Sequence, residues 1–176
     1  MLGIGPTLPA GWQAQTTHEQ DSGPTATAPE PSLVSADDCN YLISDGLDLA
    51  KGLSVAAASE PVSSSSASAG VVLHAYRPGD AAKSLAQVRQ NLASACNGFT
   101  VMRMGGVVDV DVSATPVPGL GDEALLVKVA PKGPYIQQED LVVRHGNLTI
   151  NLSANNALTA MPDLSPVAAA LVAGMG

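Results

Sequence analysis

The stretch Asp80–Cys96, DAAKSLAQVRQNLASAC, is the most clearly amphipathic segment of the chain. Its apolar residues recur at helical spacing and form one face: Leu85, Val88, Leu92 and Ala95 or Cys96. Asp80 is a suitable N-cap because its carboxylate accepts backbone N–H bonds of the first turn. The segment ends on one of only two cysteines. We therefore expect a central helix that carries a cross-link at its C-terminal end.

The other cysteine, Cys39, lies in a second amphipathic segment at residues 35–52, for which Ser35 is the expected N-cap and Gly52 the end. The 57 positions between the cysteines match no zinc site and no CxxC redox motif. A long-range disulfide between two helices fits better, and closing such a loop would stabilise the fold by about 4 kcal/mol. Two buried free thiols are the alternative.

The composition limits the class of protein. A chain of 176 residues with 45% hydrophobic content can form one domain with a real core, and the 3% aromatic content makes that core aliphatic. The formal charge of -8 argues against nucleic acid and anionic lipid as partners. No run of apolar residues is long enough to span a membrane, so membrane attachment would need a tether that this sequence lacks.

Alternating and β-rich segments predict the sheet. The candidate strands are residues 53–62, 71–76, 99–104, 107–115, 123–129, 141–144 and 148–152, with 12–19 as a further one. Short connections favour antiparallel pairing. A short C-terminal helix is expected with Ser165 as its N-cap, Pro166 at its first position and Gly174 at its end. We expect an α+β fold: an antiparallel sheet of about 6–7 strands with two disulfide-linked helices packed on one face.

Two low-complexity stretches are predicted to be loops. Residues 20–31 are rich in Pro, Thr and Ala, and residues 63–70 (SSSSASAG) suggest a mobile hairpin loop. We divide the chain into an N-terminal strand and loop at 1–33, part of the domain or leading into it, and an α+β domain at 34–176.

Three residues are candidates for ligand binding. His74 and Tyr76 alternate on one strand face, where they could provide hydrogen bonding and stacking, or simply form an exposed face. Arg144 could hold an anionic ligand, or pair with Glu139 or Asp140.

Further polar residues are assigned structural roles. Gly119, Gly121, Asp122 and Glu123 are expected to form a turn in which the carboxylates accept backbone N–H bonds. Asp109 and Asp111 share a strand face at a separation that glycosidases use, but a solvated face is the more economical interpretation. No metal-ligand spacing, GxSxG motif or cofactor motif occurs, so we predict neither a metal, a cofactor nor catalytic residues.

Several blocks resemble the extracellular sensor-domain family of PknH-type receptor kinases and related actinobacterial envelope lipoproteins: ADDC at 36–39, LHAY at 73–76, LAQVRQNLASAC at 85–96, PGLGDEALLV at 118–127 and LVVRHGNLTINL at 141–152. The resemblance covers about 34–175. It implies an antiparallel sheet backed by helices, a disulfide between two helices, and a ligand-binding cleft outside the membrane. The resemblance implies two disulfides, whereas this chain has only one possible pair of cysteines.

The combined expectation is a non-enzymatic sensor or ligand-binding domain of a lipoprotein or receptor, located outside the cell or in its envelope. Its ligand would be a small molecule or an envelope component. The alternative is a structural or interaction lipoprotein that docks another envelope protein, with the loop at 63–70 as the candidate docking surface. A hydrolase that uses Asp109 and Asp111, or a histidine with a carboxylate, is the remaining hypothesis. The sequence does not determine the oligomeric state.

Overall fold

The computed structural model describes residues 7–15, 20–24, 39, 53–94, 96–103, 105–157 and 160–175. Within these residues it shows one antiparallel sheet and two helices. The elements in chain order are β1 (Gln13–Ala14), β2 (Gln20–Pro24), β3 (Ala56–Ser63), β4 (Ser68–Ala75), α3 (Asp80–Ser94), β5 (Phe99–Arg103), β6 (Gly106–Pro116), β7 (Glu123–Pro131), β8 (Gln138–His145), β9 (Leu148–Asn155) and α4 (Ser165–Ala173). Among the described residues, no helix is long and apolar enough to cross a membrane.

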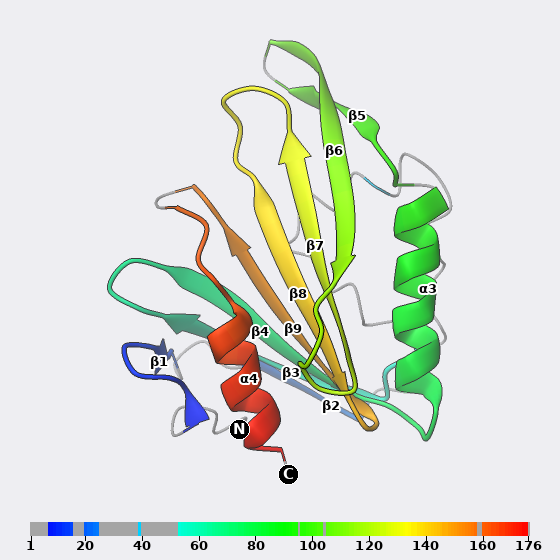
Figure 1. The fold of residues 1–176 in the computed structure, drawn as a ribbon, viewed down its shortest axis with the longest axis vertical. Helices are drawn as coiled ribbons and strands as arrows, with labels where there is room; N and C mark the ends of the chain where they lie inside the picture. The colour runs from blue at the N-terminus through cyan, green and yellow to red at the C-terminus, as the bar shows by residue number, and fades with distance from the viewer. Residues whose placement is uncertain are drawn as a thin grey trace.

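The nine strands form the order β1-β3-β4-β9-β8-β7-β6-β5, with β2 also paired to β3 (Figure 1). The strands β1 and β2 pair with opposite ends of β3, so they share one outer row of the sheet. At the other side of the sheet, the outer row is β5, which is less than half as long as its partner β6. This difference in length leaves part of β6 on the edge of the sheet.

The two helices cover opposite faces of the sheet. Successive residues of a strand point to opposite faces. In β8, Val142 belongs to the hydrophobic cluster that contains Leu85 of α3, whereas Leu141 and Val143 belong to the cluster that contains Val167 of α4. We call the two sides the α3 face and the α4 face. In Figure 1, α3 flanks the β5–β6 side of the sheet and α4 lies across the opposite half.

This arrangement corrects the expected fold. The disulfide between Cys39 and Cys96 is present, but it does not join two described helices, since Cys96 lies beyond the last residue of α3. The predicted helix at 35–52 lies outside the described residues except for Cys39. Within the described residues the sheet has nine strands and not the predicted 6–7, because β1 forms inside the additional candidate strand at 12–19 and β2 forms inside the stretch predicted to be a loop. An outer row tolerates a proline such as Pro24 there, since one side of it needs no N–H donor.

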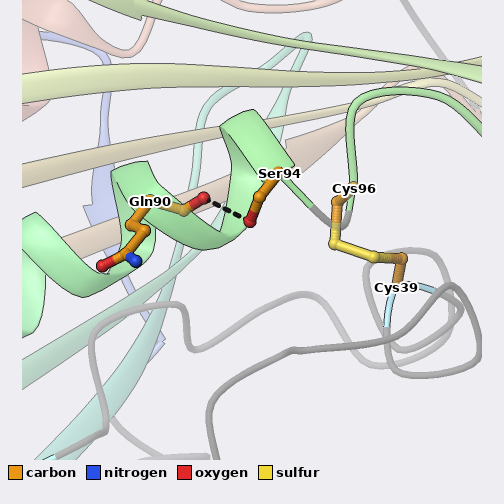
Figure 2. Close-up of a disulfide and its surroundings, with 4 residues drawn as sticks. All are labelled: Cys39, Gln90, Ser94 and Cys96. Carbon is orange, nitrogen blue, oxygen red and sulfur yellow. Dashed lines mark hydrogen bonds between the residues drawn. A yellow bond between two sulfur atoms is a disulfide. The ribbon is translucent and has the colours of Figure 1, made fainter.

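The disulfide is part of the core on the α3 face. Cys39 and Cys96 are fully buried, and their Cα atoms are 5.5 Å apart, within the usual range for a disulfide. Figure 2 shows the bond just past the last turn of α3, where the Ser94 hydroxyl donates to the Gln90 carbonyl oxygen at 2.7 Å. The bond therefore holds the connection between α3 and β5.

The serine-rich hairpin has a shorter turn than the predicted loop at 63–70. β3 and β4 pair as far as Ser63 and Ser68, which leaves a short turn. The Ser64 hydroxyl oxygen accepts N–H bonds from Ser66 at 3.3 Å and from Ala67 at 3.1 Å. Side-chain bonds of this kind give the backbone of a turn its partners, so small polar residues suffice without a packed loop.

The start of α4 also differs from the prediction. Ser165 is the first helical residue and not the cap, and Leu164 at the cap position makes no side-chain bond. Instead the Asp163 carboxylate accepts the N–H of Ser165 at 2.9 Å. Pro166 lies in the first turn and Gly174 follows the last helical residue, as the sequence predicts.

Candidate functional site

An open groove of about 410 Å³ lies between α3 and the outer edge of β6. Its helix side is formed by Arg89, Leu92, Ala93 and Asn97, and its sheet side by Val112, Ser113, Ala114, Pro116 and Leu125. The lining is mainly apolar, with a charged residue from α3 (Arg89), a polar one from the turn that follows it (Asn97) and a polar one from β6 (Ser113). Ligand sites commonly have volumes of about 300–1,000 Å³ and this kind of lining. The groove is therefore a candidate binding site.

A chain of ion pairs runs from the groove along the sheet. Arg89 contacts Glu123 at 2.5 Å between guanidinium nitrogen and carboxylate oxygen, and Glu123 contacts Arg144 at 3.5 Å. Arg144 also pairs with Asp122 at 3.0 Å. Because Arg89 and Asp122 are both substantially exposed, solvent weakens the outer pairs, and the network mainly orients its side chains. Glu123 thus fixes the position of Arg89 at the groove.

The candidate ligand residues His74, Tyr76 and Arg144 gather on the α3 face. Thr149 of β9 is opposite His74 on one side and opposite Arg144 on the other. His74, Thr149 and Arg144 therefore form one cross-strand row. The Tyr76 hydroxyl lies 3.1 Å from the Thr149 hydroxyl oxygen, and the His74 and Tyr76 rings are 6.2 Å apart between centroids. The strand register therefore brings together residues that are far apart in the sequence.

Neither this row nor Tyr76 lines the groove. His74 and Tyr76 are only 2% and 6% exposed, while Arg144 remains half-buried at the end of the row. A role in ligand binding for these three residues stays a prediction. The row is linked to the groove through Glu123, which contacts Arg144 on one side and Arg89 on the other.

Arg144 has different partners from the two that the sequence suggested. Glu139 lies on the opposite face and pairs with Lys128 at 2.6 Å. Asp140 lies on the same face as Arg144 but four residues away along the strand, which is about 13 Å. The partners of Arg144 are Asp122 and Glu123, which the turn before β7 places beside it. Glu139 cannot pair with Arg144 because it points to the opposite face, and Asp140 cannot because it lies too far along the strand.

The Gly119–Glu123 turn packs against the β8–β9 hairpin. The Asp122 carboxylate accepts the backbone N–H of Gly146 at 2.7 Å, so its partner is in another turn and not in its own. This hydrogen bond, opposed in part by desolvation and assisted by Arg144, lowers the pKa of Asp122 below its usual value. Gly121 has a φ of 60°, and a Cβ there would lie 2.5 Å from the Arg144 carbonyl oxygen. Glycine is therefore required at this contact.

Asp109 and Asp111 project from β6 on the α4 face, at a place that α4 does not cover. Their side chains are 63% and 70% exposed and lie 3.5 and 3.9 Å from the Lys132 ammonium. Neither has the apolar surroundings that a general acid of a hydrolase needs. Within the residues that the structure describes, no three His, Cys, Asp or Glu side chains group as metal ligands.

Sequence reasoning missed the burial of Asp140. This carboxylate is fully buried on the α3 face, where it accepts hydrogen bonds from Gln138 Nε2 at 2.8 Å and from the Ser153 hydroxyl. Desolvation outweighs these bonds and raises the pKa of Asp140 to about 6. Strand alternation could have predicted this burial, because Asp140 is two positions from the core residue Val142 and therefore lies on the same face.

Comparison with known proteins adds a likeness of fold. No protein-family model and no curated protein matches the chain. Among solved structures, the extracellular domain of PknH from Mycobacterium tuberculosis is 16% identical, with 89% of this chain and 84% of that chain covered and a TM-score of 0.53. A putative uncharacterized protein (Rv0999 ortholog) from Mycobacterium smegmatis is 14% identical, with 98% and 91% covered and a TM-score of 0.44. The chain thus has a PknH-like fold, and at this identity the likeness concerns the fold alone.

Proposed function

We propose that this chain is a non-enzymatic extracellular or cell-envelope domain of a lipoprotein or receptor, and that it binds its ligand in the groove between α3 and β6. The groove carries this proposal, because it is open, largely apolar and of ligand size, about 410 Å³. Arg89 and Asn97 supply polar groups that can orient a ligand in it. The exposure of Asp109 and Asp111 favours binding over hydrolysis.

The location is supported by chemistry and by fold. A buried disulfide between distant cysteines persists in an oxidising compartment and is rare in a reducing cytoplasm. The fold is similar to that of a receptor-kinase extracellular domain. Both observations agree with a domain outside the membrane, attached to a lipoprotein or a receptor.

A ligand screen with a groove-blocking variant tests this function. Small envelope-derived metabolites are screened by thermal shift, and hits are mapped by amide chemical shifts. Ala93→Tyr places a large side chain in the groove and is expected to abolish the binding of genuine hits. Ala86→Tyr is the matched control, since Ala86 is also exposed on α3 but does not line the groove. Hits that bind Ala93→Tyr as well as the native protein would place the site elsewhere.

A further inference from the structure

We infer that the groove takes an extended peptide segment of another protein, which adds as a strand to the outer edge of β6. The inference rests on the proposed function of the groove and specifies the chemical class of its ligand. Two observations carry it independently. Main-chain hydrogen-bonding groups of β6 face the groove, and the space beside them has the size of a short peptide segment.

The outer edge of β6 is only half covered. β5 pairs with Gly106–Val110, whereas β7 pairs with β6 along Val110–Pro116 on the other side. The described strands therefore leave the outer edge of residues 111–116 without a partner, and Ser113, Ala114 and Pro116 are exposed. At about 3.3 Å per residue this open edge is roughly 20 Å long, the length of an ordinary strand.

Two hydrogen bonds at the ends of the β6–β7 pairing show which residues of β6 direct their main chain outward. The Lys132 N–H donates to the Asp109 carbonyl oxygen at 2.8 Å, and the Val117 N–H donates to the Ala124 carbonyl oxygen at 3.0 Å. Odd-numbered residues of this strand thus direct their main chain toward β7. Since alternate residues of an antiparallel strand use opposite edges, Val112 and Ala114 direct both N–H and C=O outward.

The outward-facing residues of β6 also line the groove, together with Ser113 between them. Val112, Ala114 and Pro116 belong to its sheet side, and Leu92 and Ala93 of α3 stand opposite. A peptide there would continue the row that β5 begins. Its side chains on the α3 face would contact Leu92 and Ala93, and small or apolar ones fit this lining.

The ligand is a peptide from another protein and not a second copy of this chain. Because α3 forms the second wall of the groove, a second copy would have to bring its own sheet edge and its own α3 into the same space. A volume of about 410 Å³ accommodates a short segment and not a second sheet with its helix. Main-chain groups at strand spacing are matched by a peptide backbone, which supplies donors and acceptors at the same interval.

Hydrogen exchange of the free protein tests the geometry first. The amides of Val112 and Ala114 are expected to exchange quickly, because they point away from β7. The amides of Ser113 and Thr115 are expected to exchange slowly, because they pair with β7 and serve as internal controls. Slow exchange at Val112 and Ala114 in the monomer would mean that the edge is already occupied, and would overturn the inference.

Binding is then tested with a displayed library of random seven-residue peptides, from which the strongest binder is synthesised. The peptide is expected to protect the Val112 and Ala114 amides from exchange. Ala114→Pro removes one outward N–H and is expected to weaken binding by about tenfold. Ala114→Ser keeps that N–H and is the matched control. If Ala114→Pro fails to fold, N-methylation of the peptide amides that face β6 gives the same test on the native protein.

The outcomes separate this inference from the proposed function. A peptide that protects Val112 and Ala114 and is weakened by Ala114→Pro or by N-methylation supports strand addition. Absence of any binder, or a binder that Ala114→Pro leaves unaffected, overturns strand addition, while small-molecule hits blocked by Ala93→Tyr would leave the proposed function standing. Self-association that protects Val112 and Ala114 would show that the occupant is a second copy and would also overturn the inference.

Discussion

Asp140→Asn is expected to stabilise the folded protein at neutral pH. Burial raises the pKa of Asp140 from 3.8 to about 6, so the folded state holds its proton more tightly than the unfolded chain does. Stability is therefore highest below pH 3.8, falls as the pH rises through about 6, and is constant above. A pKa difference of this size corresponds to about 3 kcal/mol at neutral pH. Asparagine carries no charge and removes this penalty.

The asparagine can keep both hydrogen bonds. Its carbonyl oxygen accepts from the Gln138 amide, and its amide group donates to the Ser153 hydroxyl oxygen. The variant should therefore gain stability from the lost charge without leaving a buried polar group unpaired. Asp111→Asn is the matched control, because it removes the same charge from a side chain that is 70% exposed.

Urea unfolding at pH 5 and pH 7 measures the effect. The native protein should lose about 1 kcal/mol more than Asp140→Asn between these two pH values, with Asp111→Asn behaving like the native protein. Because the pKa of Asp122 is lowered from 3.8, this group changes the stability only below about pH 3.8 and does not contribute between pH 5 and pH 7. Parallel pH dependence of the native protein and Asp140→Asn, or a variant less stable at pH 7, would refute the reasoning.

Two further stability predictions concern the disulfide and the glycine turn. The double variant Cys39→Ser with Cys96→Ser should lose about 4 kcal/mol of unfolding free energy, because the unfolded chain is no longer constrained by its cross-link. Denaturant unfolding measures this, and a loss below about 1 kcal/mol would contradict the chain-entropy account. Gly121→Ala should cost more than Gly119→Ala, since both have positive φ but only Gly121 approaches a carbonyl oxygen. We expect about 1 kcal/mol for Gly119→Ala and about 2–3 kcal/mol for Gly121→Ala by thermal unfolding, and equal losses would exclude the contact.

The strands of the second half were predictable because their patterns are regular. In β6, Val108 and Val110 are buried whereas Asp109 and Asp111 are exposed, as the alternation indicates. The prediction that the helices pack on one face of the sheet was wrong, although the runs of consecutive apolar residues in β7 and β8 indicated that both faces are covered. A strand with one covered face alternates, whereas one covered on both faces is apolar throughout. Leu141, Val142 and Val143 are all buried for this reason.

The candidate site was only partly accessible to sequence reasoning. The row of His74, Thr149 and Arg144 depends on strand register, which no local pattern specifies. The groove depends on two lengths, since β5 ends after Arg103 while β6 continues to Pro116. Both lengths were close to prediction, but which edge of β6 stays open depends on strand order. Because β7 pairs with one edge of β6, the edge that stays open beyond β5 is the opposite one.

The disulfide also ties the helix wall of the groove to the redox state of the chain. Cys96 immediately precedes Asn97, which lines the groove, so the bond anchors the turn that joins its helix wall to β5. Before oxidation that wall is held by noncovalent packing alone, and we expect weaker peptide binding; measurement with and without reductant checks this. Such a chain would reach its full affinity for the peptide only after it has left a reducing compartment and the disulfide has formed.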